Sequence, residues 1–181
     1  MVENTTDYSL DTDTLTLLGL DRQPFGDDAA AYIDDELETK LNIAGGLLES
    51  TGSFVLVTGR DGVGKSRFVR EISQVAPNVD MRLVDDAAKG AGALLKRVGW
   101  NSGQSVEDLA RTLGIADRRI ALAVDDAGNL PREVIVNLAR AQRGLAMHAV
   151  ELPIVLVCPN DDVPTLREGL AEGGIEEDAI H

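Results

Sequence analysis

The stretch FVLVTGRDGVGKS, residues 54–66, decides the fold. It opens with a short apolar and β-branched run, which is typical of a buried strand in a parallel sheet. The next eight residues, 59–66, match the pattern G-x-x-x-x-G-K-[ST] at every fixed position. A helix is expected from about Gly64 to Val75, because Pro77 ends it. A strand, a glycine-rich turn and a helix in this order predict a phosphate-binding loop.

Each fixed residue of this loop has a physical task. The glycines permit backbone angles and a close approach that a Cβ atom would block, so successive N–H groups can surround a β-phosphate. Lys65 can reach the β and γ oxygens as a point charge, and the Ser66 hydroxyl can ligate Mg²⁺. The following helix adds its unpaired N–H groups and positive dipole end. We therefore predict that the chain binds ATP or ADP with Mg²⁺. The predicted nucleotide-binding residues are Gly59, Arg60, Asp61, Gly62, Val63, Gly64, Lys65, Ser66, Arg67 and Asn160.

Two adjacent acids after another buried strand, residues 119–124, complete the predicted site. Asp125 is expected to organise Mg²⁺ through water, together with Ser66. Asp126 stands where hydrolases of this type place the acid that polarises the attacking water, so Asp126 and Lys65 are the predicted catalytic residues. A similar pair, Asp85-Asp86, is interpreted as solvated surface.

Asn160 follows a further strand, residues 153–158, where a γ-phosphate sensor could lie. A turn residue after Pro159 explains it equally well. Cys158 is interpreted as a buried, reduced thiol, because it ends an apolar run. The sequence shows no cluster with zinc spacing and no G-x-S-x-G nucleophile signature.

Strands and helices alternate along the chain, which predicts an α/β three-layer sandwich around a mainly parallel sheet of about four strands. Residues 1–16 are expected to be a flexible leader, 17–171 the phosphate-loop domain, and 172–181 an acidic tail or the start of a linker. The expected strands are 53–58, 79–84, 119–124 and 153–158. The expected helices are 28–50, 64–75, 87–98, 105–114, one starting near 131, and 164–171.

Charge and apolar run length argue against nucleic-acid binding and membrane insertion. The 181 residues include 17 Lys and Arg against 31 Asp and Glu, a formal charge of −14. A surface that neutralises phosphodiesters needs a local excess of basic residues, so no tight nucleic-acid binding is expected. Apolar runs reach only four to six residues, far short of the roughly 20 that cross a bilayer, so we expect no membrane insertion and a cytoplasmic location.

Three stretches together resemble the ExeA/GspA-type branch of the AAA ATPases, over roughly residues 17–170. They are LGL…PF at 18–25, the phosphate-binding loop, and VDDAGNL at 124–130. The resemblance implies that Asp125 and Asp126 are Walker B acids and that residues 20–25 flank the adenine. It also implies a fifth strand and a helical lid, neither of which we find in the sequence. Arginine fingers in such ATPases usually come from a neighbouring subunit; Arg140, Arg143 and Arg167 are candidates.

The predicted function is that of a Mg²⁺-dependent, ATP-binding AAA-type module that hydrolyses ATP slowly. Slow hydrolysis is expected because the family's second acid is usually Glu and Asp126 is one methylene shorter. The alternative is a nucleotide-responsive scaffold module of a cell-envelope, secretion or division complex, with little or no hydrolysis. The expected partners are nucleotide, a second copy of the chain, and envelope, secretion or division proteins. We also expect the chain to be the N-terminal, cytoplasmic piece of a larger protein.

Overall fold

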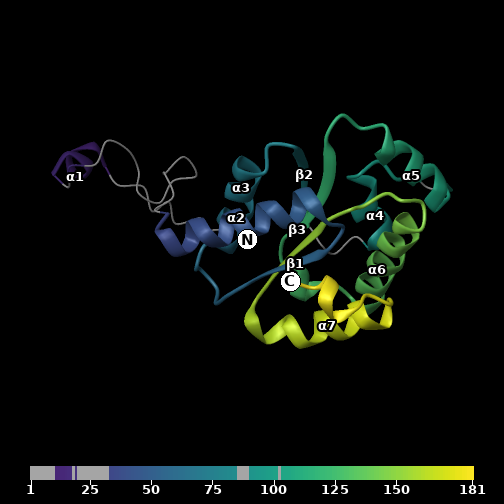
Figure 1. Cartoon of the computed structure of the whole chain (residues 1–181). Helices are drawn as coiled ribbons and strands as arrows, with labels where there is room; N and C mark the ends of the chain where they lie inside the picture. The colour runs from purple at the N-terminus through teal and green to yellow at the C-terminus, as the bar shows by residue number, and fades with distance from the viewer. Residues whose placement is uncertain (1–10, 18, 20–32, 85–89, 102) are drawn as a thin grey trace, which may run out of the picture. The chain divides into compact units, whose positions relative to one another are not determined.

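A computed structural model of the chain describes residues 11–17, 19, 33–84, 90–101 and 103–181 (Figure 1). The chain divides into two compact units, Met1–Glu38 and Thr39–His181. In the first unit, helix α1 (Thr12–Leu17) begins where the Thr14 N–H donates to Asp11 Oδ1 at 2.8 Å. The start of helix α2 (Asp35–Ser50) is capped in the same way by Asp34. The expected adenine-flanking residues 20–25 and the acids at 85–86 lie outside the described residues.

The second unit is built on a parallel sheet. Its strands are β1 (Phe54–Thr58), β2 (Val79–Val84), β3 (Arg119–Val124) and β4 (Ile154–Cys158), in the order β1-β4-β3-β2. All three neighbouring pairs are parallel. The predicted α/β class and four-stranded parallel sheet are therefore confirmed, and each strand lies within one residue of its predicted bounds.

Helices cover both faces of this sheet (Figure 1). On one face lie α2 and α3 (Lys65–Val75). The other face carries α4 (Ala91–Lys96), α5 (Val106–Gly114), α6 (Arg132–Ala146) and α7 (Val163–Glu172). Among the described residues, short 3-10 turns follow strand or helix ends: η2 (Ala127–Asn129), η3 (Asn160–Asp162) and η4 (Glu177–Ala179).

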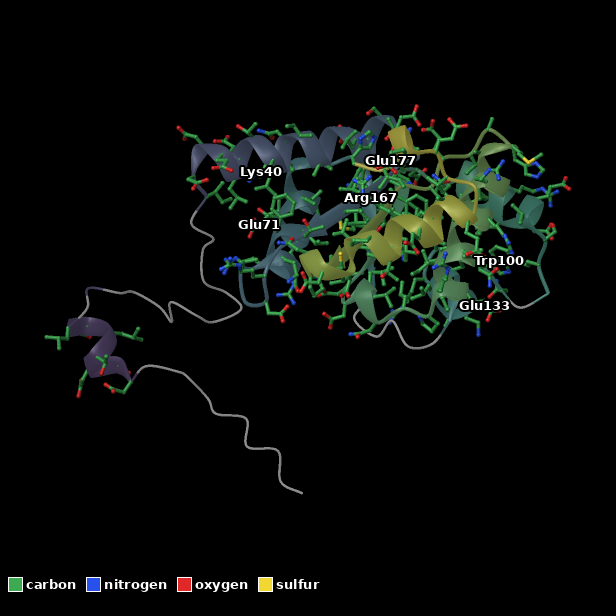
Figure 2. The ribbon with its side chains drawn as sticks, turned by 90° about the horizontal axis from the view of Figure 1, so that it is seen from below. Lys40, Glu71, Trp100, Glu133, Arg167 and Glu177 are labelled. Atoms are coloured by element: carbon green, nitrogen blue, oxygen red, sulfur yellow. The ribbon has the colours of Figure 1, made fainter. Side chains whose placement is uncertain are left out.

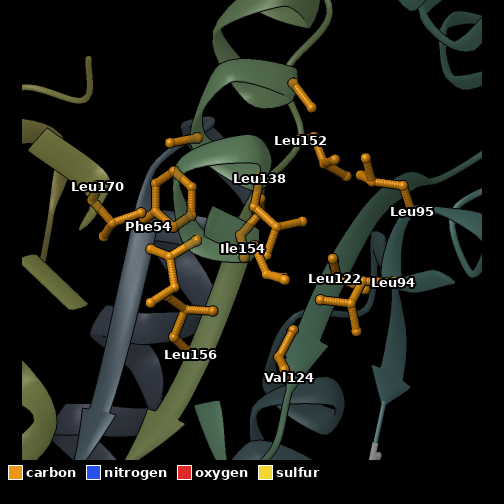
Figure 3. Close-up of a cluster of buried hydrophobic side chains, with 14 of the residues drawn as sticks. Phe54, Leu94, Leu95, Leu122, Val124, Leu138, Leu152, Ile154, Leu156 and Leu170 are labelled. Carbon is orange, nitrogen blue, oxygen red and sulfur yellow. The ribbon is translucent and has the colours of Figure 1, made fainter. Parts of the chain in front are cut away.

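Successive side chains of each strand point to opposite faces of the sheet. Because both faces are buried, the strands contribute to two hydrophobic cores. One set packs with Leu138 of α6 and its neighbours (Figure 3). The other set faces α2 and α3, where Leu41, Leu48 and Ile72 are fully buried. The first set includes Phe54, Leu122, Val124, Ile154 and Leu156, and the second Val55, Val57, Ala121, Ala123, Val155 and Val157.

Helix α2 continues through a glycine pair, Gly45-Gly46. A Cβ atom on Gly45 would lie 3.1 Å from Val75 Cγ2 at the end of α3. The small residue therefore allows α2 and α3 to approach closely, and packing outweighs the low helix propensity of glycine.

The last ten residues differ from the expected acidic tail. Ile175 and Ile180 are buried, and Ile180 forms a parallel bridge with Phe54. The His181 N–H donates to the Phe54 carbonyl at 2.9 Å, and the Leu56 N–H donates to the His181 carbonyl at 2.8 Å. The edge of β1 is thus partly covered by the C-terminal residues. The two isolated isoleucines explain the difference, because they are too few to form a periodic signal among the acids.

Candidate functional site

The loop between β1 and α3 has the backbone that the motif predicts. Gly62 and Gly64 have φ values of 78° and 90°, in the left-handed region that disfavours residues with a side chain. A Cβ atom added to either would meet nothing within 4 Å, so both face open space. No side chain caps the N-terminus of α3. The loop therefore presents an uncapped helix start beside a space that could receive a phosphate.

The Lys65 ammonium lies over this loop. Its Nζ donates to the carbonyl oxygens of Gly59 and Arg60, at 3.1 Å each, and lies 3.5 Å from Asp61 Oδ1. An ammonium group has three donors and no acceptor, so anionic oxygens can replace these partners. The Asp61 side chain is 92% exposed, and an ion pair so open to solvent contributes little stability.

The two predicted Walker B acids follow β3 in a tight turn. The Asp125 N–H donates to the Val84 carbonyl at 2.9 Å, so the β2–β3 ladder extends to this residue. The Asp125 carboxylate accepts the Asp126 N–H at 3.0 Å, while Asp126 itself has a φ of 51°. Asp125 is half-buried and Asp126 is exposed. The turn thus holds one carboxylate against the sheet and leaves the other open to solvent.

The topology brings the loop and the acids to one edge of the sheet. Strand β4 lies between β1 and β3, with Thr58 opposite Cys158 and Val124 opposite Leu156. The loop, the start of η3 at Asn160, and the Asp125 turn therefore follow neighbouring strand ends. Asn160 is exposed at this edge, between the other two parts of the site.

Cys158 is buried beneath this edge, as predicted. Only 1% of the residue is exposed. Burial raises the pKa of its thiol to about 11, with a further rise from the negative charge of Asp162 and a partial offset from the positive charge of Lys65. The charges of Asp162 and Lys65 therefore both act on this sulfur.

The residues present fit a nucleotide with Mg²⁺. Ser66 is exposed at the start of α3, and Asp125 offers a carboxylate at the neighbouring edge. Among the described residues, no group of three or more His, Cys, Asp or Glu side chains could hold a metal. Nucleotide-bound Mg²⁺ needs no such group, because phosphate oxygens and waters supply most of its ligands.

Several predicted arginines have partners within the chain. Arg67 Nε lies 3.8 Å from Glu71 Oε1, one turn further along α3. Arg167 of α7 pairs with Glu177 (Figure 2). A Cβ atom on Gly174 would lie 2.9 Å from Arg143 Cζ, so this guanidinium packs on the C-terminal segment. Arg140 is exposed on α6.

The Asp162 side chain contacts Gly128 at this edge, which the sequence does not predict. A Cβ atom on Gly128 would collide with the Asp162 carboxylate, whose Cγ would be 2.7 Å away. Asp162 is the third residue of an Asn-Asp-Asp run after Pro159, which resembles any polar turn. No sequence signal separates it from Asp161.

A hollow of about 460 Å³ lies at the opposite end of β3, lined by residues that include Leu113, Arg118, Ile120 and Val150. Its other arginine, Arg119, pairs with Glu151 at 2.7 Å. This hollow is remote from the loop, because it borders the first residues of β3 and the loop borders the last residues of β1.

No protein-family model matches the chain, and no curated protein matches it. Solved structures do match. Cdc6p from Pyrobaculum aerophilum aligns with a TM-score of 0.58 at 18% identity, over 86% of this chain and 47% of that one. The Orc1 protein of Aeropyrum pernix, solved in complex with DNA, aligns with a TM-score of 0.51 at 15% identity, over 85% and 47%. A RuvB variant from Thermotoga maritima aligns with a TM-score of 0.47 at 20% identity, over 76% and 43%.

The chain spans slightly less than half the length of the Cdc6p and Orc1 structures. At these identities the likeness concerns the fold alone. The described helices include none long and apolar enough to cross a bilayer. The likeness to Cdc6p and Orc1, with the parallel sheet and its loop, shows that this chain has an α/β fold of the P-loop NTPase type.

Proposed function

We propose that the chain binds ATP or ADP with Mg²⁺ at residues 59–66 and hydrolyses ATP slowly. The observation that carries this proposal is the position of the Lys65 ammonium. It donates to loop carbonyls beside two left-handed glycines, at the sheet edge where Asp125 follows β3. A cation at a glycine-rich helix start is the arrangement that holds polyphosphates.

The proposed roles follow from the chemistry of each group. Lys65 and the loop N–H groups hold the β- and γ-phosphates, and Asn160 contacts the γ-phosphate. Ser66 and Asp125 hold Mg²⁺, which when bound neutralises charge on the phosphate oxygens. Asp126 orients and polarises water, and its exposure leaves the carboxylate accessible to solvent. Gly59, Arg60, Asp61, Gly62, Val63, Gly64 and Arg67 complete the proposed nucleotide contacts.

A nucleotide-responsive scaffold is the second candidate, of the ExeA/GspA type and with partners in an envelope, secretion or division complex. Two observations favour it. The side chains of Arg167 and Arg143 are engaged by the chain's own C-terminal segment, which supports a site without a finger from either residue. An arginine finger contributes about 10³–10⁵ in rate, so hydrolysis would be very slow unless the exposed Arg140 supplies one.

Tight DNA binding is not part of the proposal, although the Orc1 structure contains DNA. The chain carries a net charge of −14. Of its three arginines near residue 115, Arg111 pairs with Glu107 and Asp108, and Arg119 pairs with Glu151. These pairs reduce the positive charge available to phosphodiesters.

Titration with a fluorescent ADP analogue in Mg²⁺ tests the binding site. Lys65→Ala should weaken binding by about 10- to 100-fold, the usual effect of losing a charge-assisted hydrogen bond. Lys96→Ala, which removes an exposed lysine of α4, is the matched control and should bind like the wild type. Equal affinity of wild type and Lys65→Ala, with both folded by circular dichroism, would refute the proposal.

Phosphate release separates the enzyme from the scaffold. A rate per chain that rises with protein concentration, and that Asp126→Asn abolishes, supports an ATPase completed by a neighbouring copy. No release at any concentration, even from Asp126→Glu, supports the scaffold.

A further inference from the structure

We propose that Asp162 is a positioning residue of this nucleotide site. Its carboxylate, packed on Gly128, holds the turn that carries Asp125 and Asp126. The inference rests on the proposed function and extends it to a residue on a different strand end.

The first observation is steric. The three atoms nearest to a Cβ built on Gly128 all belong to Asp162, and the carboxylate occupies the space such a Cβ would need. Gly128 is not among the described glycines with a positive φ, so its backbone would accept alanine. Asp162, and not backbone geometry, is therefore what excludes a side chain at position 128.

The second observation is that the Asp162 side chain does not cap α7, the helix that follows it. It occupies the N-cap position of α7, where an aspartate normally accepts a hydrogen bond from the first turn of the helix. Its side chain makes no such bond. Within the described part of the chain, its carboxylate also forms no ion pair. The group is turned toward η2 instead of serving the helix that it begins.

The third observation is the place of η2. This turn contains Gly128, begins directly after Asp126, and packs against both β4 and α7. Asp126 has a φ of 51°, a conformation that costs a non-glycine residue free energy and needs support from its surroundings. The Asp162–Gly128 contact supplies that support from the neighbouring strand end.

The charge of Asp162 also belongs to this edge. The negative charge of Asp162 raises the pKa of the Cys158 thiol and the positive charge of Lys65 lowers it, so both charges act on the end of β4. Removal of the Asp162 side chain should therefore loosen the Asp125 turn without changing the phosphate loop itself.

The test compares affinities for a fluorescent ATP analogue in Mg²⁺ and in EDTA. The ratio of the affinity in Mg²⁺ to the affinity in EDTA measures how much the metal adds to binding. This separates the effect of the metal, which Asp125 organises, from that of the phosphate-binding loop. Asp162→Ala should reduce this ratio by about tenfold, the lower end of the losses seen when groups that orient metal ligands are removed. Its affinity in EDTA should stay within about twofold of the wild type.

Three further variants sharpen the test. Asp162→Asn keeps the size of the side chain and should preserve most of the ratio. Gly128→Ala displaces the carboxylate from the other side and should lower the ratio, whereas Gly128→Ala in the Asp162→Ala background should do less harm than alone. Asp161→Asn, an exposed neighbour in the same turn, is the control and should behave like the wild type.

Opposite results would overturn the role of Asp162. One such result is an unchanged ratio of affinities in both Asp162→Ala and Gly128→Ala. The other is an equal loss of nucleotide affinity in Mg²⁺ and in EDTA on Asp162→Ala, which indicates a purely structural residue. Absence of nucleotide binding by the wild-type chain is a different result, because it refutes the proposed function and the positioning role with it.

Discussion

Asp61 places a negative charge inside the phosphate-binding loop. Its Oδ1 lies 3.5 Å from Lys65 Nζ, and the side chain projects into solvent. A bound polyphosphate would compete with this carboxylate for Lys65 and would be repelled by it. The motif fixes the lysine and the glycines but leaves position 61 open, so the sequence pattern alone does not predict this competition.

Asp61→Asn should therefore bind nucleotide more tightly, by about two- to fivefold at low salt, with a smaller gain at high salt because exposed charges are screened. Titrations of a fluorescent ADP analogue at two ionic strengths measure the effect. Asp117→Asn, an exposed acid at the other end of β3, is the control. Equal affinities of Asp61→Asn and the wild type at low salt would contradict the prediction.

Cys158 gives a pH-dependent prediction. Its folded pKa, about 11, is above the value of 9.0 for an unperturbed thiol, because burial disfavours the thiolate. The unfolded chain therefore loses this proton first, and stability should fall as pH rises from about 9 to about 11. Urea unfolding across this range should show a shallower decline for Cys158→Ala than for the wild type, and parallel curves would refute the assignment.

At the scale of elements, a capping box starts α5. The Asp108 N–H donates to Ser105 Oγ at 3.2 Å, and the Ser105 N–H donates back to Asp108 Oδ2 at 3.1 Å. Ser105→Ala should destabilise the protein by about 1 kcal/mol, measured by urea unfolding. Ser73→Ala, at an exposed position within α3, should cost less, and a reversed order would contradict the capping role.

The elements also show what sequence can and cannot predict. The four strands were predictable within one residue, because apolar runs bounded by Gly, Pro or charged residues are typical of a buried parallel sheet. The loop and the Asp125 turn were predictable because their motifs follow such strands. The Asp162–Gly128 contact was not, since it depends on how two turns from adjacent strand ends meet. Nor was the packing of Ile175 and Ile180, because neither belongs to a periodic pattern.

At the scale of the whole molecule, the C-terminal segment is part of the folded unit. Ile180 is 6% exposed and belongs to the core cluster that contains Phe54. Arg167 pairs with Glu177 and Arg143 packs against Gly174, both of which precede Ile180. The segment that composition marks as a polar tail thus contributes to the hydrophobic core.

Ile180→Ala should destabilise the protein by about 2–5 kcal/mol, as expected when a large side chain is removed from a core. Ile115→Ala is the matched control, because Ile115 is 80% exposed and its loss should change stability by less than about 0.5 kcal/mol. Thermal unfolding followed by circular dichroism measures both. Equal melting temperatures for the two variants would show that the segment does not stabilise the fold.

The bridge between Ile180 and Phe54 also defines a path for mechanical force. His181 and β1 are joined by two backbone hydrogen bonds and run in parallel, and β1 leads directly into the loop at Gly59. Tension applied to the chain at His181 along the strand would load those two bonds in shear, and the strand would transmit it to the backbone around Lys65. A pull at His181 and the occupancy of the phosphate-binding loop would then be linked through a strand five residues long.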